Sequence, residues 1–382
     1  MAKNVKGNGS IYKRKDGYWE GKVTVGTDPM TGKLIRKSVY GKTQQEVRKK
    51  INELTTTVDN GTYTEPVKLT VNQWLDVWTA EYLDGVKPNT QDRYKMICRR
   101  HINPTIGAVK LISLSAHTVQ TLINGLGREK GLAPKTVRNI HGCLHKALQT
   151  AVRIGYLKNN PSDACILPRL RNHEIKPLDE VSTGVFIQAI KGNRFENLYF
   201  MALFTGVRQG EAIGLTWDRV DFEKGIITVD RQLQRNRVKG IFELSSTKNG
   251  KSRVITPPER VMAVLRDQKR AQAVLRLAAG ELWQDNGYVF TDEIGGHVSP
   301  TTVYKHFKRI VAEIGKPDRR FHDLRHTYAT MALANGVGVK DVQETLGHYS
   351  AAFTLDKYGH VTENMKRDNA AKIDRFIDTL TT

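Results

Sequence analysis

Two short stretches rich in proline, glycine and charged residues interrupt the hydrophobic pattern, and they limit the possible folds more than any other feature. The first is "DNGTYTEPVKL" at residues 59–69, and the second is "LPRLRNHEIKPLD" at residues 167–179. The periodicity of the apolar residues changes across the first stretch, which is typical of a linker between domains. The 382 residues therefore predict a multidomain α+β chain with domains at 1–62, 67–160 and 177–382.

Residues 1–62 are predicted to form a small three-stranded antiparallel sheet followed by one helix. Short β-prone runs alternate with turn signals at Asp16-Gly17 and 28–32, and Thr43 and Glu46 have the spacing of a capping box. The strands carry basic residues interleaved with aromatic ones, namely Lys13, Arg14, Lys22, Lys33, Arg36 and Lys37. Such a sheet can enter the major groove of DNA, and a solvated basic surface is the alternative interpretation.

Residues 67–160 are predicted to form a compact domain of four helices. Four segments have apolar residues at helical spacing, and each begins with a start signal: Thr70, Asn89, Ser115 or Pro134. Their polar faces carry Arg and Lys side chains that suit phosphate groups, although a solvated face is again the alternative.

The net positive charge of the chain indicates the class of molecule that it binds. Sixty Lys and Arg residues against 39 Asp and Glu give a formal net charge of +21, divided as +7, +9 and +5 over residues 1–62, 63–176 and 177–382. This is typical of a protein that binds a polyanion, with nucleic acid the first candidate. No apolar run long enough to span a membrane and no secretory signal is evident, which favours the cytoplasm. Three scattered cysteines predict neither a disulfide framework nor a thiolate metal site.

The last domain contains four informative stretches. "FTGVRQGEAIGL" places Arg208 in the first turn of a helix with Glu211 three residues later, where a simple salt bridge is the plain interpretation. "SSTKNGKSRVITPP" is predicted to be a β-ribbon turn with Lys248 near its tip. In "ETLGHYSAAFTLDKYGH", His348 ends a helix and Tyr358 follows ten residues later.

The fourth stretch, "RFHDLRHTYATMALANG", is predicted to be one helix with a polar head and an apolar body. Helical spacing places His322, Arg325 and His326 on one face. Two histidines four residues apart also occur in zinc-binding helices. However, Asp323 stands where the zinc-protease motif has glutamate, and Arg325 would lie beside the cation. We therefore expect no metal, and we expect His326 to have a structural or supporting role.

The ordered set T-G-x-R-x-x-E, T-K-x-x-x-S-R, H-x-L-R-H and L-G-H followed by T-x-x-x-Y extends this interpretation. With these motifs the chain resembles the tyrosine recombinases, and most closely the integrases of temperate phages and integrative conjugative elements. The resemblance covers the whole chain. It implies an arm-type DNA-binding domain at 1–62, a core-binding domain at 67–160, and a mainly helical catalytic domain with a small antiparallel sheet at 177–382.

The resemblance also implies a role for each site residue. Tyr358 would attack the scissile phosphate and form a 3′-phosphotyrosine, and Arg208 and Arg325 would hold the phosphate through bidentate contacts. Four further residues are implied: Lys248 as the general acid for the 5′-hydroxyl, His322 as acid or base at the tyrosine, His348 as a hydrogen-bond donor to the phosphate, and Glu211 as a supporting carboxylate. No cofactor is implied, because the covalent intermediate conserves the bond energy.

The implied partners are double-stranded DNA attachment sites with core and arm sequences, a homotetramer on DNA, a DNA-bending host factor and an excisionase. The implied location is the cytoplasm of a bacterial host cell. A type IB topoisomerase and a non-catalytic DNA-binding protein are the alternatives. A DNA-binding protein without catalysis would explain the charge but not the ordered motifs, and a topoisomerase would not need the separate basic N-terminal domain.

Overall fold

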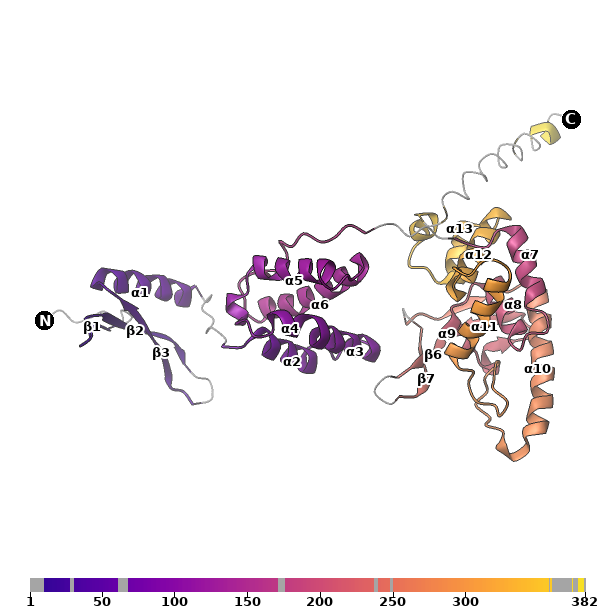
Figure 1. Ribbon diagram of the computed structural model, residues 1–382, viewed down its shortest axis with the longest axis horizontal. Helices are drawn as coiled ribbons and strands as arrows, with labels where there is room; N and C mark the ends of the chain where they lie inside the picture. The colour runs from indigo at the N-terminus through magenta and orange to yellow at the C-terminus, as the bar shows by residue number, and fades with distance from the viewer. Residues whose placement is uncertain are drawn as a thin grey trace. The chain divides into compact units, whose positions relative to one another are not determined.

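The computed structural model describes residues 10–27, 31–60, 68–170, 176–236, 240–247, 250–356, 358, 373 and 377–380. The chain divides into two compact units, Met1–Leu170 and Arg171–Thr382, so the boundary lies inside the second predicted linker. The predicted α+β organisation is confirmed, with small antiparallel sheets among many helices (Figure 1).

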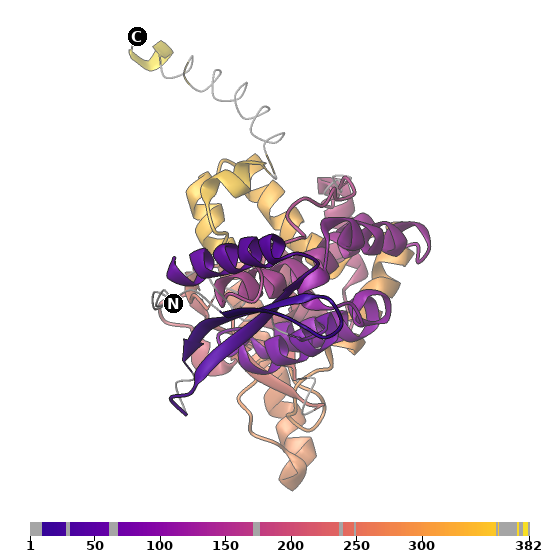
Figure 2. The ribbon, with the colours of Figure 1, turned by 90° about the vertical axis from the view of Figure 1, so that its left-hand side faces the viewer.

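The N-terminal segment has the predicted sheet and helix. Strands β1 (Ser10–Lys13), β2 (Trp19–Thr27) and β3 (Leu34–Gly41) pair antiparallel in the order β1-β2-β3, and helix α1 is Gln44–Asp59. Figures 1 and 2 both show α1 lying along one face of this sheet. Alternate β2 residues Val23 and Val25 pack there against Val47 and Ile51, so the segment has a small core of its own.

The rest of the first unit is helical. It contains α2 (Val71–Glu81), α3 (Pro88–Ile97), the short α4 (Asn103–Ile106), α5 (Ala116–Arg128) and α6 (Pro134–Arg153). The four predicted helices are therefore confirmed as α2, α3, α5 and α6. One start was misplaced: α3 begins at Pro88 after Lys87 rather than at Asn89, because proline fits the first helical position.

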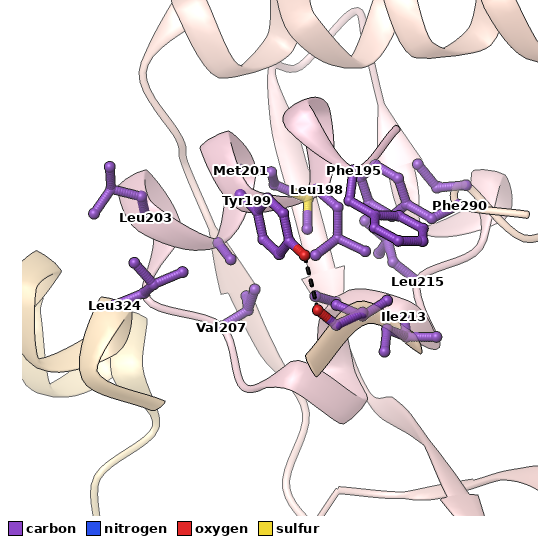
Figure 3. Close-up of a cluster of buried hydrophobic side chains, with 14 of the residues drawn as sticks. Phe195, Leu198, Tyr199, Met201, Leu203, Val207, Ile213, Leu215, Phe290 and Leu324 are labelled. Carbon is purple, nitrogen blue, oxygen red and sulfur yellow. Dashed lines mark hydrogen bonds between the residues drawn. The ribbon is translucent and has the colours of Figure 1, made fainter. Parts of the chain in front are cut away.

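The helices of the second unit surround an apolar core. They are α7 (Glu180–Ala189), α8 (Glu196–Thr205), α9 (Gln209–Ile213), α10 (Glu259–Ala279), α11 (Pro300–Glu313), α12 (Phe321–Ala334) and α13 (Val339–Leu346). Figure 3 shows part of this core around Tyr199, whose hydroxyl donates to the carbonyl of Val303 at 2.8 Å. Leu203 of α8 and Leu324 of α12 belong to the same cluster, which fixes these two helices against each other.

Two small sheets complete the second unit. Strands β4 (Val220–Asp221), β5 (Ile226–Val229) and β8 (Arg253–Ile255) pair in the order β4-β5-β8, while β6 (Arg231–Arg235) pairs with β7 (Phe242–Ser246). The predicted hairpin turn in "SSTKNGKSRVITPP" is therefore wrong. The two strands that flank it, β7 and β8, belong to different sheets: β8 pairs with β5, and β7 pairs with β6. Lys248, which that turn was predicted to carry, lies outside the described residues.

None of the helices in the described part of the chain has the length and apolar character of a membrane span.

Candidate active site

Glu211 is a buried carboxylate held by two arginines from different elements. Arg208, at the N-cap of α9, donates from its backbone amide to Glu211 Oε2 at 3.0 Å and from Nη1 to Oε1 at 2.7 Å. Arg253, at the start of β8, donates from Nη2 to Oε2 at 2.6 Å and from Nη1 to Oε1 at 3.2 Å. The Glu211 side chain is 0% exposed, so both of its oxygens are satisfied by these donors.

The electrostatics of Glu211 follow from these contacts. Burial alone would raise its pKa, but the hydrogen bonds and charge of Arg253 and the charge of Arg208 outweigh burial and lower the pKa to about 2. Glu211 is therefore ionised at neutral pH. The salt bridge between Arg208 and Glu211 predicted as the plain interpretation is present, and Arg253 adds a second one.

Arg325 is a buried guanidinium that joins three helices. It lies on α12 with 2% of its surface exposed. Its Nη1 donates to the carbonyl of Gly206, just after α8, at 2.8 Å, and its Nη2 donates to the carbonyl of Leu346 at the end of α13. A guanidinium carries five N–H groups, so these two bonds fix its plane and leave it further donors.

Two histidines of α12 lie one turn apart at the same end of the helix. The rings of His322 and His326 meet edge to face, with centroids 5.0 Å apart. Part of the His322 ring is exposed, yet burial of the rest and the charges of Arg325 and Arg208 lower its pKa to about 4. Burial and the neighbouring His322 lower the pKa of His326 to about 4 as well. Both rings are therefore neutral at pH 7.

His348 follows the left-handed Gly347 that ends α13. Its backbone is fixed by Gln343, which accepts from the His348 amide and donates from its side chain to the His348 carbonyl. The His348 Nδ1 lies 2.9 Å from the hydroxyl of Thr354. Burial and the charges of Arg325 and Arg208 lower the pKa of His348 to about 3, so this ring is neutral too.

Tyr358 is buried among these groups, with 1% of its surface exposed. Its hydroxyl lies 2.6 Å from Nδ1 of His326, and it packs with Leu333 of α12 and Leu346 of α13. Burial raises the pKa of Tyr358 to about 12, against the opposing effect of the Arg325 charge. The phenol is therefore protonated at neutral pH.

A groove of about 790 Å³ opens beside this cluster. Its lining includes Arg208, the segment at 251–254, and the end of α13 with His348. Lys251 is exposed at this groove, whereas Lys248 lies outside the described residues. The structure thus brings together Arg208, Arg325, the histidines and Tyr358.

The cluster carries an excess of positive charge. Three guanidinium groups, those of Arg208, Arg253 and Arg325, surround the single carboxylate of Glu211 and leave two charges uncompensated. Like charges in a poorly hydrated site are unfavourable unless an anion enters. The arrangement therefore suits a bound oxyanion such as phosphate. Among the described residues, no group of three or more His, Cys, Asp or Glu could hold a metal ion.

Comparison with known proteins identifies the class of enzyme. Residues 168–365 match the model described as the phage integrase family, and residues 70–127 match the N-terminal SAM-like domain of phage integrases. The chain belongs to the phage integrase family. It is a tyrosine recombinase, an enzyme that cleaves and rejoins DNA in site-specific recombination.

Relatives of this recombinase are similar over nearly its whole length. A XerC-like tyrosine recombinase of Caldanaerobacter subterraneus subsp. tengcongensis is 31% identical, over 94% of this chain and 97% of that protein. The ICEBs1 integrase of Bacillus subtilis strain 168 is 25% identical, over 96% of this chain and all of that protein (100%).

Solved structures share the fold of the recombinase. The integrase of transposon Tn1549 in complex with transposon right end DNA has a TM-score of 0.67 and 24% identity, covering 80% of this chain and 100% of that chain. A lambda integrase dimer bound to a COC′ core site has a TM-score of 0.57 and 17% identity, covering 94% of this chain and 97% of that chain.

One residue of the site, Arg253, was not singled out from the sequence, and a second, His326, was given no part in the chemistry. Arg253 ends the "TKNGKSR" stretch, and only the position of β8 reveals that it shares Glu211 with Arg208. His326 was expected to be structural or supporting, yet it contacts the Tyr358 hydroxyl directly. The signal for His326 was its spacing of four residues from His322.

Proposed function

We propose that this recombinase cleaves one DNA strand by attack of the Tyr358 oxygen on a phosphodiester, forming a 3′-phosphotyrosine and a free 5′-hydroxyl. A family of tyrosine recombinases requires such a nucleophile. The observation that carries the proposal is the burial of Tyr358 between α12 and α13, within the electrostatic reach of Arg325. Its phenol thereby lies at the same cluster as the excess positive charge.

Arg208 and Arg325 hold the phosphate in this proposal. Both have planar guanidinium forks that suit two phosphate oxygens, and both are fixed before DNA arrives, by Glu211 in one case and by the carbonyls of Gly206 and Leu346 in the other. Donors fixed in advance stabilise the charge that develops on the phosphate without reorganising. Glu211 is the supporting carboxylate.

His348 donates a hydrogen bond to the same phosphate. Its neutral ring has one N–H, and a Thr354 hydroxyl that donates to Nδ1 leaves this hydrogen on Nε2. His322 acts beside it as the acid or base at the exposed end of the α12 face. Lys248 is the general acid that protonates the leaving 5′-oxygen, a role that rests on its place in "TKNGKSR".

The two N-terminal regions bind DNA at different places in this proposal. Residues 67–160 contact the core sequence around the cleaved phosphate, and residues 1–62 bind an arm sequence farther away. The match of residues 70–127 to the N-terminal SAM-like domain of phage integrases supports the first assignment. The separate core of the β1–β3 sheet and α1 supports the second.

The substrate is double-stranded DNA carrying the attachment sites of a mobile element or prophage. Lambda integrase, which shares the fold, was solved as a tetramer on a Holliday junction, and we propose a homotetramer on DNA here too. A DNA-bending host factor and an excisionase assist it, and the reaction takes place in the cytoplasm of the bacterial host. No cofactor or metal takes part, because arginines supply the positive charge at the phosphate.

Substitution of the nucleophile tests the proposal. Tyr358→Phe is expected to bind a nicked core-site duplex as the wild type does, but to form no denaturant-resistant protein–DNA adduct, because the ring remains and the attacking oxygen is removed. The matched control is Tyr304→Phe on the exposed part of α11, which should form the adduct at the wild-type rate. Adduct formation by Tyr358→Phe would remove Tyr358 from this role.

A further inference from the structure

The hydrogen bond between Tyr358 and His326 links the proposed nucleophile to a group that can take its proton. The distance from the Tyr358 hydroxyl to Nδ1 of His326 is 2.6 Å, and the ring centroids are 5.9 Å apart. His322, the histidine expected to act at the tyrosine, meets His326 edge to face. The order of contact in the structure is therefore His322, His326, Tyr358.

The direction of this hydrogen bond depends on the tautomer of His326, because a neutral imidazole has one N–H and one acceptor nitrogen. In the tautomer with its hydrogen on Nε2, the Tyr358 hydroxyl donates to Nδ1, and this is the arrangement in which Nδ1 can take the phenolic proton. Both side chains are held in place: His326 by the rigid turn of α12, and Tyr358 by packing against Leu333 and Leu346. The geometry thus exists before DNA binds.

We propose that His326 accepts the phenolic proton of Tyr358 during strand cleavage and returns it during rejoining. This inference rests on the proposed function of Tyr358 as the nucleophile. In cleavage, the Tyr358 oxygen forms a bond to phosphorus while the bond from phosphorus to the 5′-oxygen breaks. The phenolic proton passes to Nδ1 of His326, and the general acid protonates the departing 5′-oxygen. Rejoining reverses both transfers.

Burial keeps the proposed nucleophile protonated until a phosphate is in place. In the free protein the pKa of Tyr358 is about 12 and that of His326 about 4, so the proton stays on the tyrosine. The phenol becomes acidic only as its oxygen bonds to phosphorus. A bound phosphodiester also places a negative charge near Arg325, which offsets one of the cations that lower the pKa of His326.

The charged and titratable groups that face His326 come from three places. His322, Asp323 and Arg325 lie on the same helix as His326, and Arg320 is the N-cap of that helix. His348 and Tyr358 follow α13. The histidines among these are already neutral above pH 7. Tyr358 and Arg325, whose pKa burial and the Arg208 charge lower to about 9, are the groups that can change their protonation state there.

The test is the pH profile of single-turnover adduct formation on a nicked core-site duplex. His326→Asn places an amide oxygen at about the position of Nδ1, so it keeps an acceptor for Tyr358 but cannot take a proton. We expect it to be about 100-fold slower at pH 7, within the usual range for removal of a general base. Its rate should rise about tenfold per pH unit from pH 7 to 9, as solvent ionises Tyr358, while the wild-type rate stays flat.

Two further variants separate proton transfer from folding. His326→Ala should regain adduct formation when imidazole is added, whereas Tyr358→Phe should not. His306→Asn on α11, a partly buried histidine that packs against Phe195, should behave as the wild type at every pH. Binding of each variant to the duplex, together with its thermal unfolding, reports whether it is folded.

The outcomes distinguish the two proposals. A folded His326→Asn with the wild-type rate and a flat pH profile would overturn the role of His326 and leave Tyr358 as the nucleophile. Adduct formation by Tyr358→Phe would instead overturn the proposed function itself.

Discussion

At the scale of single residues, the site depends on cations whose positions are fixed by protein oxygens. Glu211 accepts from Arg208 and Arg253, and two main-chain carbonyls accept from Arg325. Guanidinium groups keep their charge at any physiological pH, so they can donate hydrogen bonds to a phosphate but cannot give up a proton as general acids. In the proposed mechanism the proton for the leaving 5′-oxygen comes from another group, and lysine is suited to this because its pKa falls readily when it is desolvated.

Lys248 and Lys251 are the two candidates for this proton donor. A general acid is dispensable when the leaving group needs no proton. Lys248→Ala should therefore cleave ordinary DNA poorly but recover on a duplex with a 5′-bridging phosphorothiolate, whose sulfur leaves unprotonated. Lys251→Ala, at the exposed edge of the groove, is the matched control and should not show this recovery. The measurement is the single-turnover cleavage rate of each variant on the ordinary and the phosphorothiolate duplex. Recovery by Lys251→Ala alone would assign the role of general acid to Lys251.

Sequence reasoning brought together those candidate site residues that lie close to one another along the chain. His322 and Arg325 share a helical face because of the helical repeat, and Arg208 and Glu211 are three residues apart. The pairing of Arg253 with Glu211 joins residues 42 positions apart, and that of His326 with Tyr358 joins residues 32 apart. Such contacts depend on how β8, α12 and the segment after α13 pack, which local periodicity does not specify.

At the scale of elements, the site lies where α8, α12 and α13 meet, and Gly206 is the residue at that junction. It ends α8 in a left-handed conformation with φ +63°. A Cβ there would lie 2.5 Å from Leu346 Cδ2 and 2.7 Å from Tyr328 Cδ1, so α12 and α13 approach as closely as they do only because this side chain is absent. Its carbonyl also accepts from Arg325.

Gly206→Ala is accordingly expected to destabilise the protein and to disturb Arg325. The left-handed backbone costs about 1–2 kcal/mol for a residue with a Cβ, and overpacking adds about 1–3 kcal/mol. Gly225→Ala is the control, since Gly225 has a similar φ of +66° but a Cβ at that position would have no atom within 4 Å. Chemical denaturation and adduct formation measure both effects. Equal destabilisation of the two variants would show that crowding at the junction is unimportant.

The helices were predictable because their apolar spacing and start signals are local, as at Thr70, Ser115 and Pro134. The small sheets of the second unit were less predictable. Strands β7 and β8 are adjacent in sequence, and a hairpin was the simplest expectation, but β8 pairs with β5 instead. Strands of three to five residues carry too little pattern to indicate their partners.

At the scale of the whole molecule, positive charge is concentrated away from the residues proposed to be catalytic. Residues 1–62 and 63–176 carry +7 and +9, whereas the longer segment 177–382 carries only +5. Binding to DNA should therefore depend mostly on the N-terminal regions, and its salt dependence should report how many of their cations contact phosphates. The division of the chain also allows the two basic regions to contact different stretches of one DNA molecule.

Deletion of residues 1–62 tests this division of labour. The β1–β3 sheet with α1 has its own core of Val23, Val25, Val47 and Ile51, so its removal should leave the rest folded. The truncated protein should still cleave an isolated core site, because every residue proposed to contact the phosphate lies after 200. Integration between full attachment sites should collapse, since no region would remain to bind the arm sequence.

Binding to a full site should also become less sensitive to salt, by about 0.9 in the logarithmic slope for each phosphate that the deleted region would have neutralised. The isolated fragment 1–62 should in turn prefer arm sequence over random duplex. A truncated protein that integrates as well as the full chain, or a fragment without any such preference, would show that the N-terminal cations form only a solvated surface.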